Sequence, residues 1–523
     1  MPPPSADIDE VVFRNDLRPL ASDAYEGRRP GTAGEQKTVS FLTAQFKQLG
    51  LKPGNGESYL QQVPLVEITA AKTAQLSVQG PAGVQSLRYG KDVVIWSRRE
   101  TPAVSLAQSE LVFAGYGIVA PEYKWNDYAA LDVRGKTVLL LTGDPGTAGK
   151  DPTLFKGKFL SYYGRFEYKL AEAARQGAAG VLLIHDAATL GYGWDAVVNV
   201  WTGPRLELAA QDGHAGRAAI EGWLTGEAGR ALFTAAGLDY ESLSHAAARP
   251  GFKAVPMGLK VGARLDDSIR RFDSDNVIAL LPGGERKHEY VLYCAHWDGL
   301  GRDASGAVLP GAQADANGVA GLMTLAQSFS RTRPPPQRSI VFVAFTGGEE
   351  DRLGSRYYVD HPVFPLEQTT AAISLDRLHV GGRTRDVMVM GAGNSEVEAY
   401  VRGAALLQGR ELRPDSRPEL GRFYESDQLS FALRGVPALY VKAGTDDAAS
   451  GPRWGEAQLE DYLAHRYAQA ADKYSEDWDL GGTIEDLELY REIGQRLADN
   501  RRFPRWLPNS EFSANRVHPL PED

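Results

Sequence analysis

The chain has 523 residues, a length that predicts two or three domains at ~100–200 residues per domain. Its apolar content of 43% and charged content of 24% are ordinary for a globular protein. The net charge of -10 suggests no basic face and argues against a nucleic-acid partner. No stretch approaches the ~20 apolar residues that a membrane span needs. The single cysteine, Cys294, excludes an intrachain disulfide and a cysteine metal site, and it is expected to be a buried packing residue.

The pattern of apolar residues divides the chain into three segments. Residues 1–105 begin with helical patterns over 8–50 and continue as short strands. Residues 106–256 alternate strand, helix and strand, as a compact α/β unit does. Residues 257–523 form a second α/β series that closes with a helix near 485–499. The expected strands of that series cover 276–281, 290–295, 339–345, 370–375, 386–391 and 437–441, and its expected helices cover 316–330, 395–407 and 426–434.

Two adjacent glutamates, Glu349 and Glu350, follow the apolar run 339–345, which is typical of a buried strand. Ligands bind at the carboxyl edge of the strands in α/β sheets, and both carboxylates lie at that edge. Neighbouring side chains point in different directions, so one carboxylate can hold a metal while the other moves a proton. Taken alone, the pair fits an acidic surface loop equally well.

Polar groups also follow two other expected strands of the series. His296 and Asp298 come after 290–295, and a His-x-Asp pair suits a metal-binding imidazole that is steadied by a carboxylate. Asp376 comes after the strand that ends at 375. In isolation the histidine fits a capped core residue and the aspartate fits a helix cap. Together with the glutamates they predict one crevice that suits a divalent ion, zinc above all.

The order of these motifs carries a resemblance to a known family. The motifs are His296-Trp-Asp298, a Gly-Ala…Gly-Val-Ala segment over 311–320, Glu349-Glu350…Leu353-Gly-Ser355, Leu375-Asp376, and Ser426-Asp427…Gly435-Val-Pro437. This order resembles the M28 family of zinc aminopeptidases, and residues 111–255 resemble the protease-associated (PA) domain often inserted in that family. The resemblance implies an α/β fold with a mixed, mostly parallel sheet flanked by helices and an inserted PA-like α/β domain.

The resemblance also implies two zinc ions that share a bridging aspartate. His296 and Asp376 match the other ligands of the first zinc, and Glu350 matches the carboxylate of the second. Glu349 matches the general base that takes a proton from the attacking water. Asp298 matches the carboxylate partner of His296.

The chain departs from the family pattern at several site positions. Ala314 stands where the bridging aspartate is expected, and Asp315 is one residue late. Ala468 stands where the last histidine ligand is expected. Gly299 and Gln428 occupy positions where related chains often carry histidine. Two of the five expected ligands are therefore methyl groups.

Two divalent ions ~3.5–4 Å apart need a shared anion, so the usual two-zinc centre is not expected to form. At most one well-bound zinc ion is expected, with no organic cofactor. The candidate substitute ligands are Asp315, His379 and His465, each of which also fits a surface or capping residue. Without metal, Glu349 and Glu350 would repel each other, and one pKa would rise.

Three functions remain open. The first is an aminopeptidase-like hydrolase with a reduced or rebuilt metal site, in which Glu349 is the base and Tyr467 polarises the carbonyl, with Tyr424 and Gln428 as substrate contacts. The second is an inactive peptidase-like protein that binds peptides or small amides. The third is metal-independent chemistry by the Glu349/Glu350 pair with His296.

The N-terminal residues 1–7 show no charged stretch followed by an apolar one, so no signal peptide is expected in this chain. The resemblance nevertheless implies a periplasmic or secreted protein. The expected partner is a peptide or small amide, and the sequence leaves the oligomeric state open.

Overall fold

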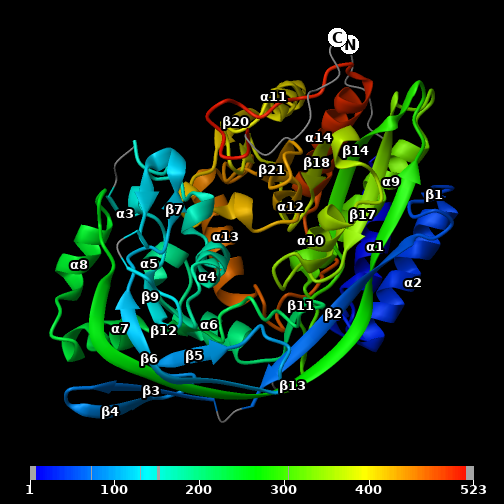
Figure 1. Ribbon diagram of the computed structural model, residues 1–523. Coiled ribbons are helices and arrows are strands. Elements are labelled where there is room, and N and C mark those ends of the chain that lie inside the picture. Colours follow the sequence, from blue (N-terminus) through cyan, green and yellow to red (C-terminus); the bar gives the residue numbers. More distant parts are fainter. Residues whose placement is uncertain (1–7, 72–73, 130, 150–152, 304, 514–523) are drawn as a thin grey trace. The chain divides into compact units, whose positions relative to one another are not determined.

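A computed structural model describes residues 8–71, 74–129, 131–149, 153–303 and 305–513 (Figure 1). Residues 1–7, on which the expectation about a signal peptide rests, lie outside these ranges. The described chain forms two compact units. The first unit contains residues 8–64, 273–416 and 425–513, and the second contains the described residues of 65–272 and 417–424. These bounds differ from the expected segments 1–105, 106–256 and 257–523.

The first unit is built on one mixed sheet. Its strands lie in the order β1-β13-β17-β14-β18-β21-β19-β20. The four central strands, β17, β14, β18 and β21, are parallel, and the remaining neighbours are antiparallel except for β19 and β20. The bounds are β1 (Lys52–Pro53), β13 (Val255–Leu281), β14 (Arg286–His296), β17 (Arg338–Phe345), β18 (Thr369–Ser374), β19 (Asp386–Val389), β20 (Glu411–Pro414) and β21 (Ala438–Ala443). The expected mixed, mostly parallel sheet is confirmed.

Helices cover both faces of this sheet because its central strands are apolar on both sides. In β14, Val291 and Tyr293 pack into one core cluster, while Leu292 and Cys294 pack into another. Cys294 is fully buried. The first cluster is shared with α1 (Glu10–Leu20), α2 (Ala33–Gln48), α9 (Asn317–Ser330), α11 (Val397–Leu407) and α14 (Gly481–Asp499), and the second with α10 (Leu353–Asp360) and α12 (Gln428–Ala432).

The first helices of the chain begin where side chains cap them. Asp9 accepts a hydrogen bond from the Val11 N–H at the start of α1, and Thr32 accepts one from the Gly34 N–H at the start of α2. Such caps satisfy backbone donors that have no partner within the helix. A short turn, Ala312–Ala316, leads directly into α9.

The second unit has its own sheet, in the order β5-β12-β10-β9-β6-β13-β3-β4, in which β12, β10, β9 and β6 are parallel. Strand β11 pairs antiparallel with β2, and β2 also pairs with β13. The strands are β2 (Leu60–Ala70), β3 (Gln75–Gly80), β4 (Gly83–Leu87), β5 (Val93–Trp96), β6 (Ala103–Phe113), β9 (Thr137–Leu141), β10 (Gly180–Ile184), β11 (Arg205–Leu208) and β12 (Ile220–Leu224). The longer helices are α4 (Phe166–Arg175), α6 (Trp194–Trp201), α7 (Gly226–Ala235) and α8 (Tyr240–Ala247).

None of the helices within the described ranges combines the length and the apolar character of a transmembrane span.

Candidate metal centre

Three neighbouring parallel strands of the first unit end at one edge of the sheet, and each delivers polar side chains there. His296 is the last residue of β14, which lies between β17 and β18. Glu349 and Glu350 follow β17, and Asp376 follows β18. Because parallel strands share their carboxyl edge, residues far apart in the chain meet at this place.

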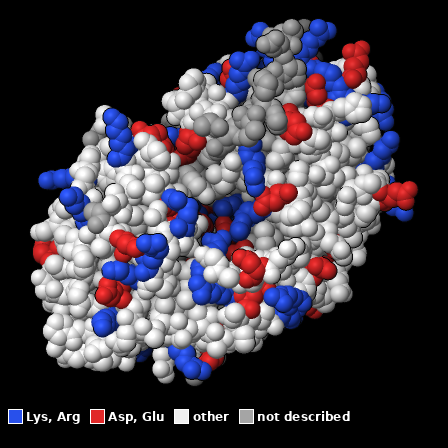
Figure 2. All heavy atoms as spheres, in the orientation of Figure 1, with Lys and Arg blue, Asp and Glu red and all other residues white. Residues whose placement is uncertain are grey.

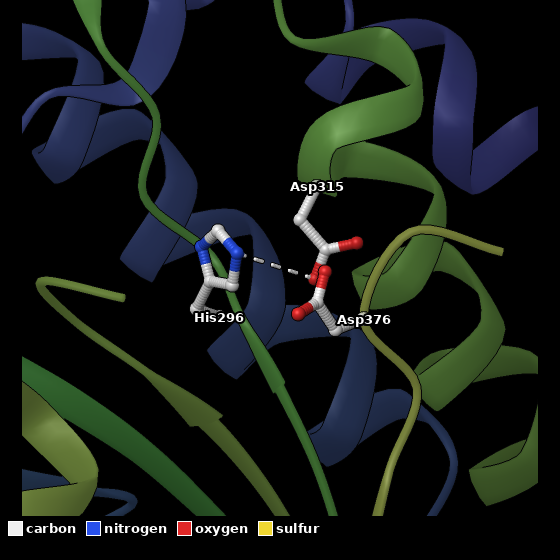
Figure 3. A group of neighbouring side chains, drawn as sticks. All are labelled: His296, Asp315 and Asp376. Atoms are coloured by element: carbon white, nitrogen blue, oxygen red, sulfur yellow. Dashed lines mark ion pairs between the residues drawn. The ribbon is translucent and has the colours of Figure 1, made fainter. Parts of the chain in front are cut away.

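His296, Asp315 and Asp376 form the group that could hold a metal ion (Figure 3). One ligand atom from each residue lies within 4.8 Å of the other two, and all three residues are buried. His296 Nε2 is 3.7 Å from Asp315 Oδ2. Asp315, a candidate substitute ligand from the sequence, is therefore placed beside the two residues that the resemblance assigns to the first zinc.

The two oxygens of Asp315 have different surroundings. Oδ1 accepts hydrogen bonds from the backbone N–H groups of Arg377, at 2.8 Å, and Gly318, at 3.1 Å. Oδ2 is buried and accepts no hydrogen bond from the described residues. A buried carboxylate oxygen without a hydrogen bond is costly, so Oδ2 is well suited to a cation.

The turn Ala312–Ala316 aims Asp315 at the site. The carboxylate of Asp472 accepts hydrogen bonds from the backbone N–H groups of Gln313 and Ala314, at 3.0 and 3.2 Å. The Tyr462 hydroxyl donates a further bond to Asp472 at 3.2 Å. These contacts fasten the turn to the segment that follows α13 (Pro452–His465).

Asp298 connects His296 with the glutamate loop. Its Oδ1 lies 3.3 Å from His296 Nδ1 and accepts a 2.7 Å hydrogen bond from the Gly348 N–H. Its other oxygen accepts from the Glu349 N–H at 3.3 Å. One carboxylate thus lies beside the imidazole and holds the loop that carries Glu349.

Burial and charge together set the protonation of the group. Burial opposes a charged imidazole, yet Asp315 and Asp298 raise the pKa of His296 well above its usual range. Burial, with the neighbouring Asp376, raises the pKa of Asp315. Burial would raise the pKa of Asp376 as well, but the cations of Arg377 and Lys442 lower it. Burial and the neighbouring charges therefore raise the pKa of His296 and Asp315 and lower that of Asp376.

Glu349 lies on the wall of a narrow cleft beside this group. The cleft has about 10 Å³ of free space, close to the minimum for one water molecule. Its lining includes Ala314, Tyr467 and Ala468, so both alanines that replace expected ligands face the same space. Burial raises the pKa of Glu349 to about 7, and nearby His296 opposes this rise.

Glu350 is engaged by a cation of the protein itself. Its Oε1 lies 3.1 Å from the Arg29 guanidinium, and both side chains are largely buried. Arg29 follows the turn Asp23–Arg28 in the N-terminal part of the chain. The carboxylate that the resemblance assigns to a second ion is thus neutralised by a guanidinium group.

The remaining predicted site residues are not members of the group formed by His296, Asp315 and Asp376. His379 Nε2 contacts the Gly382 carbonyl at 3.2 Å, and burial lowers its pKa. His465 is on α13, with a side chain that is 73% exposed and paired with Asp461. Tyr424 belongs to the second unit, where its ring centroid is 6.2 Å from that of Tyr162. Gln428 is buried at the start of α12 in the first unit.

Gly299 has no room for the histidine that the family resemblance leads one to expect there. A Cβ atom built there would lie 2.7 Å from the Gly27 carbonyl oxygen and 3.3 Å from an Arg28 nitrogen. Arg28 is itself buried and donates to the carbonyl groups of Trp297 and Pro310. The turn that precedes Arg29 therefore fills the space beside residue 299.

Sequence reasoning missed several charged residues at the site. Arg29 binds Glu350, Asp472 holds the turn before α9, and Arg377 pairs with Asp376 at 3.1 Å and with Glu425 at 2.9 Å. The Arg377 guanidinium also lies 5.4 Å from the centre of the Tyr467 ring. Only Arg377 had a signal in the sequence, because it directly follows Asp376; Arg29 and Asp472 reach the site from distant segments.

The residues present fit one divalent ion better than two. Two ligand atoms on one tetrahedral zinc lie about 3.3–3.5 Å apart, so the 3.7 Å between His296 and Asp315 needs little adjustment. One imidazole nitrogen and two carboxylate oxygens are ligands that zinc accepts. A second ion would lack the ligands expected at Ala314 and Ala468, and Glu350 is already paired with Arg29.

Comparisons with known proteins agree with this architecture. The family model of Peptidase family M28 matches residues 276–490. An aminopeptidase from Aneurinibacillus sp. strain AM-1 is similar in structure, with a TM-score of 0.55 and 19% identity over 95% of each chain. A zinc aminopeptidase from Bacillus subtilis gives a TM-score of 0.47 and 17% identity over 98% of this chain and 99% of that one.

A curated relative, the vacuolar membrane protease of Schizophyllum commune, is 32% identical over 113 residues. That match covers 21% of this chain and spans only 11% of the length of the relative. The family match covers the sheet strands β14, β17, β18 and β21 and every residue of the candidate metal group. The part of the chain that carries the candidate metal group is thus similar to Peptidase family M28.

Proposed function

We propose that this protein is an aminopeptidase-like hydrolase that works with a single divalent metal ion, zinc by preference. The observation that carries the proposal is the buried group of His296, Asp315 and Asp376, in which Asp315 Oδ2 has no hydrogen bond within the described chain. When bound, the ion would supply Lewis acidity to the carbonyl of a peptide or amide. The group fits an ion in number, type and spacing of ligand atoms.

The proposal limits the site to one ion for electrostatic reasons. Two divalent cations held close together need an anion between them, and Ala314 offers none. Ala468 offers no imidazole, and Glu350 is paired with Arg29 at 3.1 Å. The positive charge that a second ion would bring is supplied here by the guanidinium of Arg29.

Glu349 is the proposed general base. Its carboxyl lines the cleft and has a pKa raised to about 7, so it can accept a proton from the attacking water near neutral pH and pass it to the leaving amine. Tyr467 lines the same cleft, and its hydroxyl is the proposed donor to the carbonyl oxygen of the substrate. Burial raises the pKa of Tyr467, which keeps that proton in place.

Two other functions have weaker support. Metal-independent chemistry by Glu349 and Glu350 would need the two carboxyls to share a proton, whereas Glu350 is bound to Arg29. An inactive peptide-binding protein is favoured by the two alanines in the cleft, which leave the site with fewer ligands than the family pattern. Metal content distinguishes the inactive binding protein from the proposed hydrolase.

Metal content tests the proposed site directly. We expect purified protein dialysed against zinc to hold one equivalent by elemental analysis, and Asp315→Asn or Asp376→Asn to hold far less. Asp303→Asn, which removes the same charge from an exposed loop, is the matched control and should keep one equivalent. Two equivalents in the native chain would overturn the single-ion site, and none would favour the inactive binding protein.

Activity tests the role of Glu349. We expect chelator-sensitive hydrolysis of aminoacyl p-nitroanilides, with kcat lowered about 10²–10⁴-fold in Glu349→Gln because the proton acceptor is lost. The same variant should retain its zinc, since Glu349 is not in the proposed ligand group. A variant that loses zinc and activity together would make Glu349 a ligand rather than a base.

The second unit, residues 65–272 and 417–424, is proposed to be a PA-like domain inserted in the hydrolase. Its parallel strands β6, β9, β10 and β12 form a compact α/β core of their own. Peptides or small amides are the proposed substrates, and a periplasmic or secreted location is proposed from the family resemblance.

A further inference from the structure

A second pocket of the first unit lies apart from the candidate metal centre. It is formed between α1, α2 and α9 and has a volume of about 210 Å³. It shares no lining residue with the cleft beside Glu349. We call it the α1–α2–α9 pocket. Figure 1 shows the three helices together at the right of the view.

A buried carboxylate, Asp16, lines this pocket. The residue is only 8% exposed, and its side chain makes no hydrogen bond or ion pair within the described residues. The two arginines nearest to it along α1 are engaged elsewhere. Arg14 binds Glu10 and the Trp478 carbonyl, and Arg18 binds Glu476. The pocket therefore contains one negative group without a cation from the protein.

Burial without a partner changes the pKa of the Asp16 carboxyl. Burial raises the pKa of Asp16 to about 7, so the ionised form is destabilised where it stands. A carboxylate buried to this degree normally has a partner. A cationic ligand in the pocket would supply that partner and restore the ionised form.

The rest of the lining indicates which cation fits. Gln45, Gln48 and Gln327 offer amide oxygens that accept hydrogen bonds from N–H groups. Val12, Leu49 and Met323 add apolar surface that a hydrated metal ion could not use. A single carboxylate with apolar walls suits one positive charge on an organic body, since hard divalent ions take six or more oxygen ligands.

From this geometry we propose that the α1–α2–α9 pocket binds a small organic ammonium ion, with its charged nitrogen at Asp16 and its apolar body against Val12, Leu49 and Met323. The glutamine side chains accept the remaining N–H groups. The proposal is independent of the proposed hydrolase function, because the pocket shares no residue with the metal group.

Three probes of similar shape test the charge requirement. We expect n-butylammonium to bind the full chain in isothermal titration calorimetry, and 1-butanol and butyrate to bind at least tenfold more weakly. Asp16→Asn keeps the shape of the side chain and should weaken n-butylammonium binding at least tenfold. Asp23→Asn removes the same charge from an exposed position and should leave the binding constant unchanged.

A second variant tests the pocket with Asp16 intact, so that a folding effect of Asp16→Asn cannot explain both results. Gln48 is exposed at the rim of the pocket, so Gln48→Trp should block entry without disturbing the core. The proposal is overturned if the native chain does not bind n-butylammonium, if Asp16→Asn binds it as well as the native chain does, or if 1-butanol binds equally well. Unchanged binding in Gln48→Trp would place the ligand elsewhere and would also overturn it.

Discussion

At the scale of single residues, the candidate metal centre depends on one oxygen atom. Asp315 Oδ2 faces His296, while Oδ1 is held by the N–H groups of Gly318 and Arg377. The backbone thus determines which oxygen is left for a cation. The close approach of Gly318 to this carboxylate makes the arrangement sensitive to a single methyl group.

Gly318→Ala tests this close approach. A Cβ at residue 318 would lie 2.2 Å from Asp315 Oδ1 and 2.4 Å from the Leu375 carbonyl oxygen, so Asp315 would have to move. We expect the zinc affinity to fall at least tenfold, measured by competition with a chromogenic chelator. Gly284→Ala is the control, because the nearest atom to its Cβ would be Gln337 Oε1 at 3.4 Å. Equal affinity in both variants would show that Asp315 does not bind the ion.

Asp16 gives a prediction about pH and stability. Its pKa is raised to about 7 by burial, so between about pH 4 and 7 the folded chain binds more protons at this carboxyl than the unfolded chain does. Its contribution to the free energy of unfolding is therefore full at low pH and is lost as the pH rises. Relative to Asp16→Asn, the native chain should lose up to about 4 kcal/mol over this range.

Urea unfolding of both proteins at several pH values, without amines in the buffer, measures this difference. A difference in unfolding free energy that stays constant with pH would show that Asp16 titrates normally in the folded chain.

At the scale of elements, the site is assembled from strand ends and from one turn. The strands β14 and β18 supply His296 and Asp376 by their parallel pairing. The turn Ala312–Ala316 supplies Asp315, and it is held by Asp472 from the segment after α13. Asp472 is therefore expected to stabilise the turn.

Asp472→Ala tests this expectation. The change leaves two backbone N–H groups of the turn without their acceptor, which costs about 1–3 kcal/mol for each buried group. We expect urea unfolding to show a loss on the order of 2–4 kcal/mol and a lower zinc affinity. Asp461→Ala, on the exposed side of α13, should change neither. Full zinc affinity in Asp472→Ala would mean that the turn holds its shape unaided.

At the scale of the whole molecule, acidic side chains outnumber basic ones. The net charge is -10, and Figure 2 shows positive and negative side chains interspersed over the face in view. Within the first unit, opposite charges also meet inside. Arg29, from the N-terminal part of the chain, neutralises Glu350, which follows a central strand. In the proposed single-ion site, this long-range ion pair and the two alanines would limit the number of bound cations.

Restoring the ligands expected at residues 314 and 468 tests whether Arg29 limits the number of bound zinc ions. We expect Ala314→Asp with Ala468→His to bind one zinc equivalent, because Glu350 remains paired with Arg29. Adding Arg29→Gln should free Glu350 and raise the content to two equivalents by elemental analysis. Two equivalents in the double variant would show that the arginine is no barrier. One equivalent in the triple variant would show that residues 314 and 468 are not the expected ligand positions.

Much of the fold could be predicted because its signals are local. The apolar runs at 290–295, 339–345 and 370–375 are β14, β17 and β18 within a residue or a few residues at each end. The helical pattern at 316–330 is α9. Buried parallel strands require uninterrupted apolar residues, so consecutive positions of the sequence reveal them. The division into units has no such local signal. Residues 417–424 belong to the second unit, although the chain on both sides of them belongs to the first.

The sequence by itself determined that polar groups stand at the carboxyl ends of three apolar strands, because strand formation depends on neighbouring residues. It also showed that Ala314 and Ala468 cannot bind a metal. Only the tertiary structure decided that Asp315 takes a place beside His296 and Asp376, because the turn before α9 is held by a carboxylate 158 residues away from Ala314 in the chain. The pairing of Arg29 with Glu350 was likewise decided by packing, since contacts between distant segments leave no periodic trace in a single sequence.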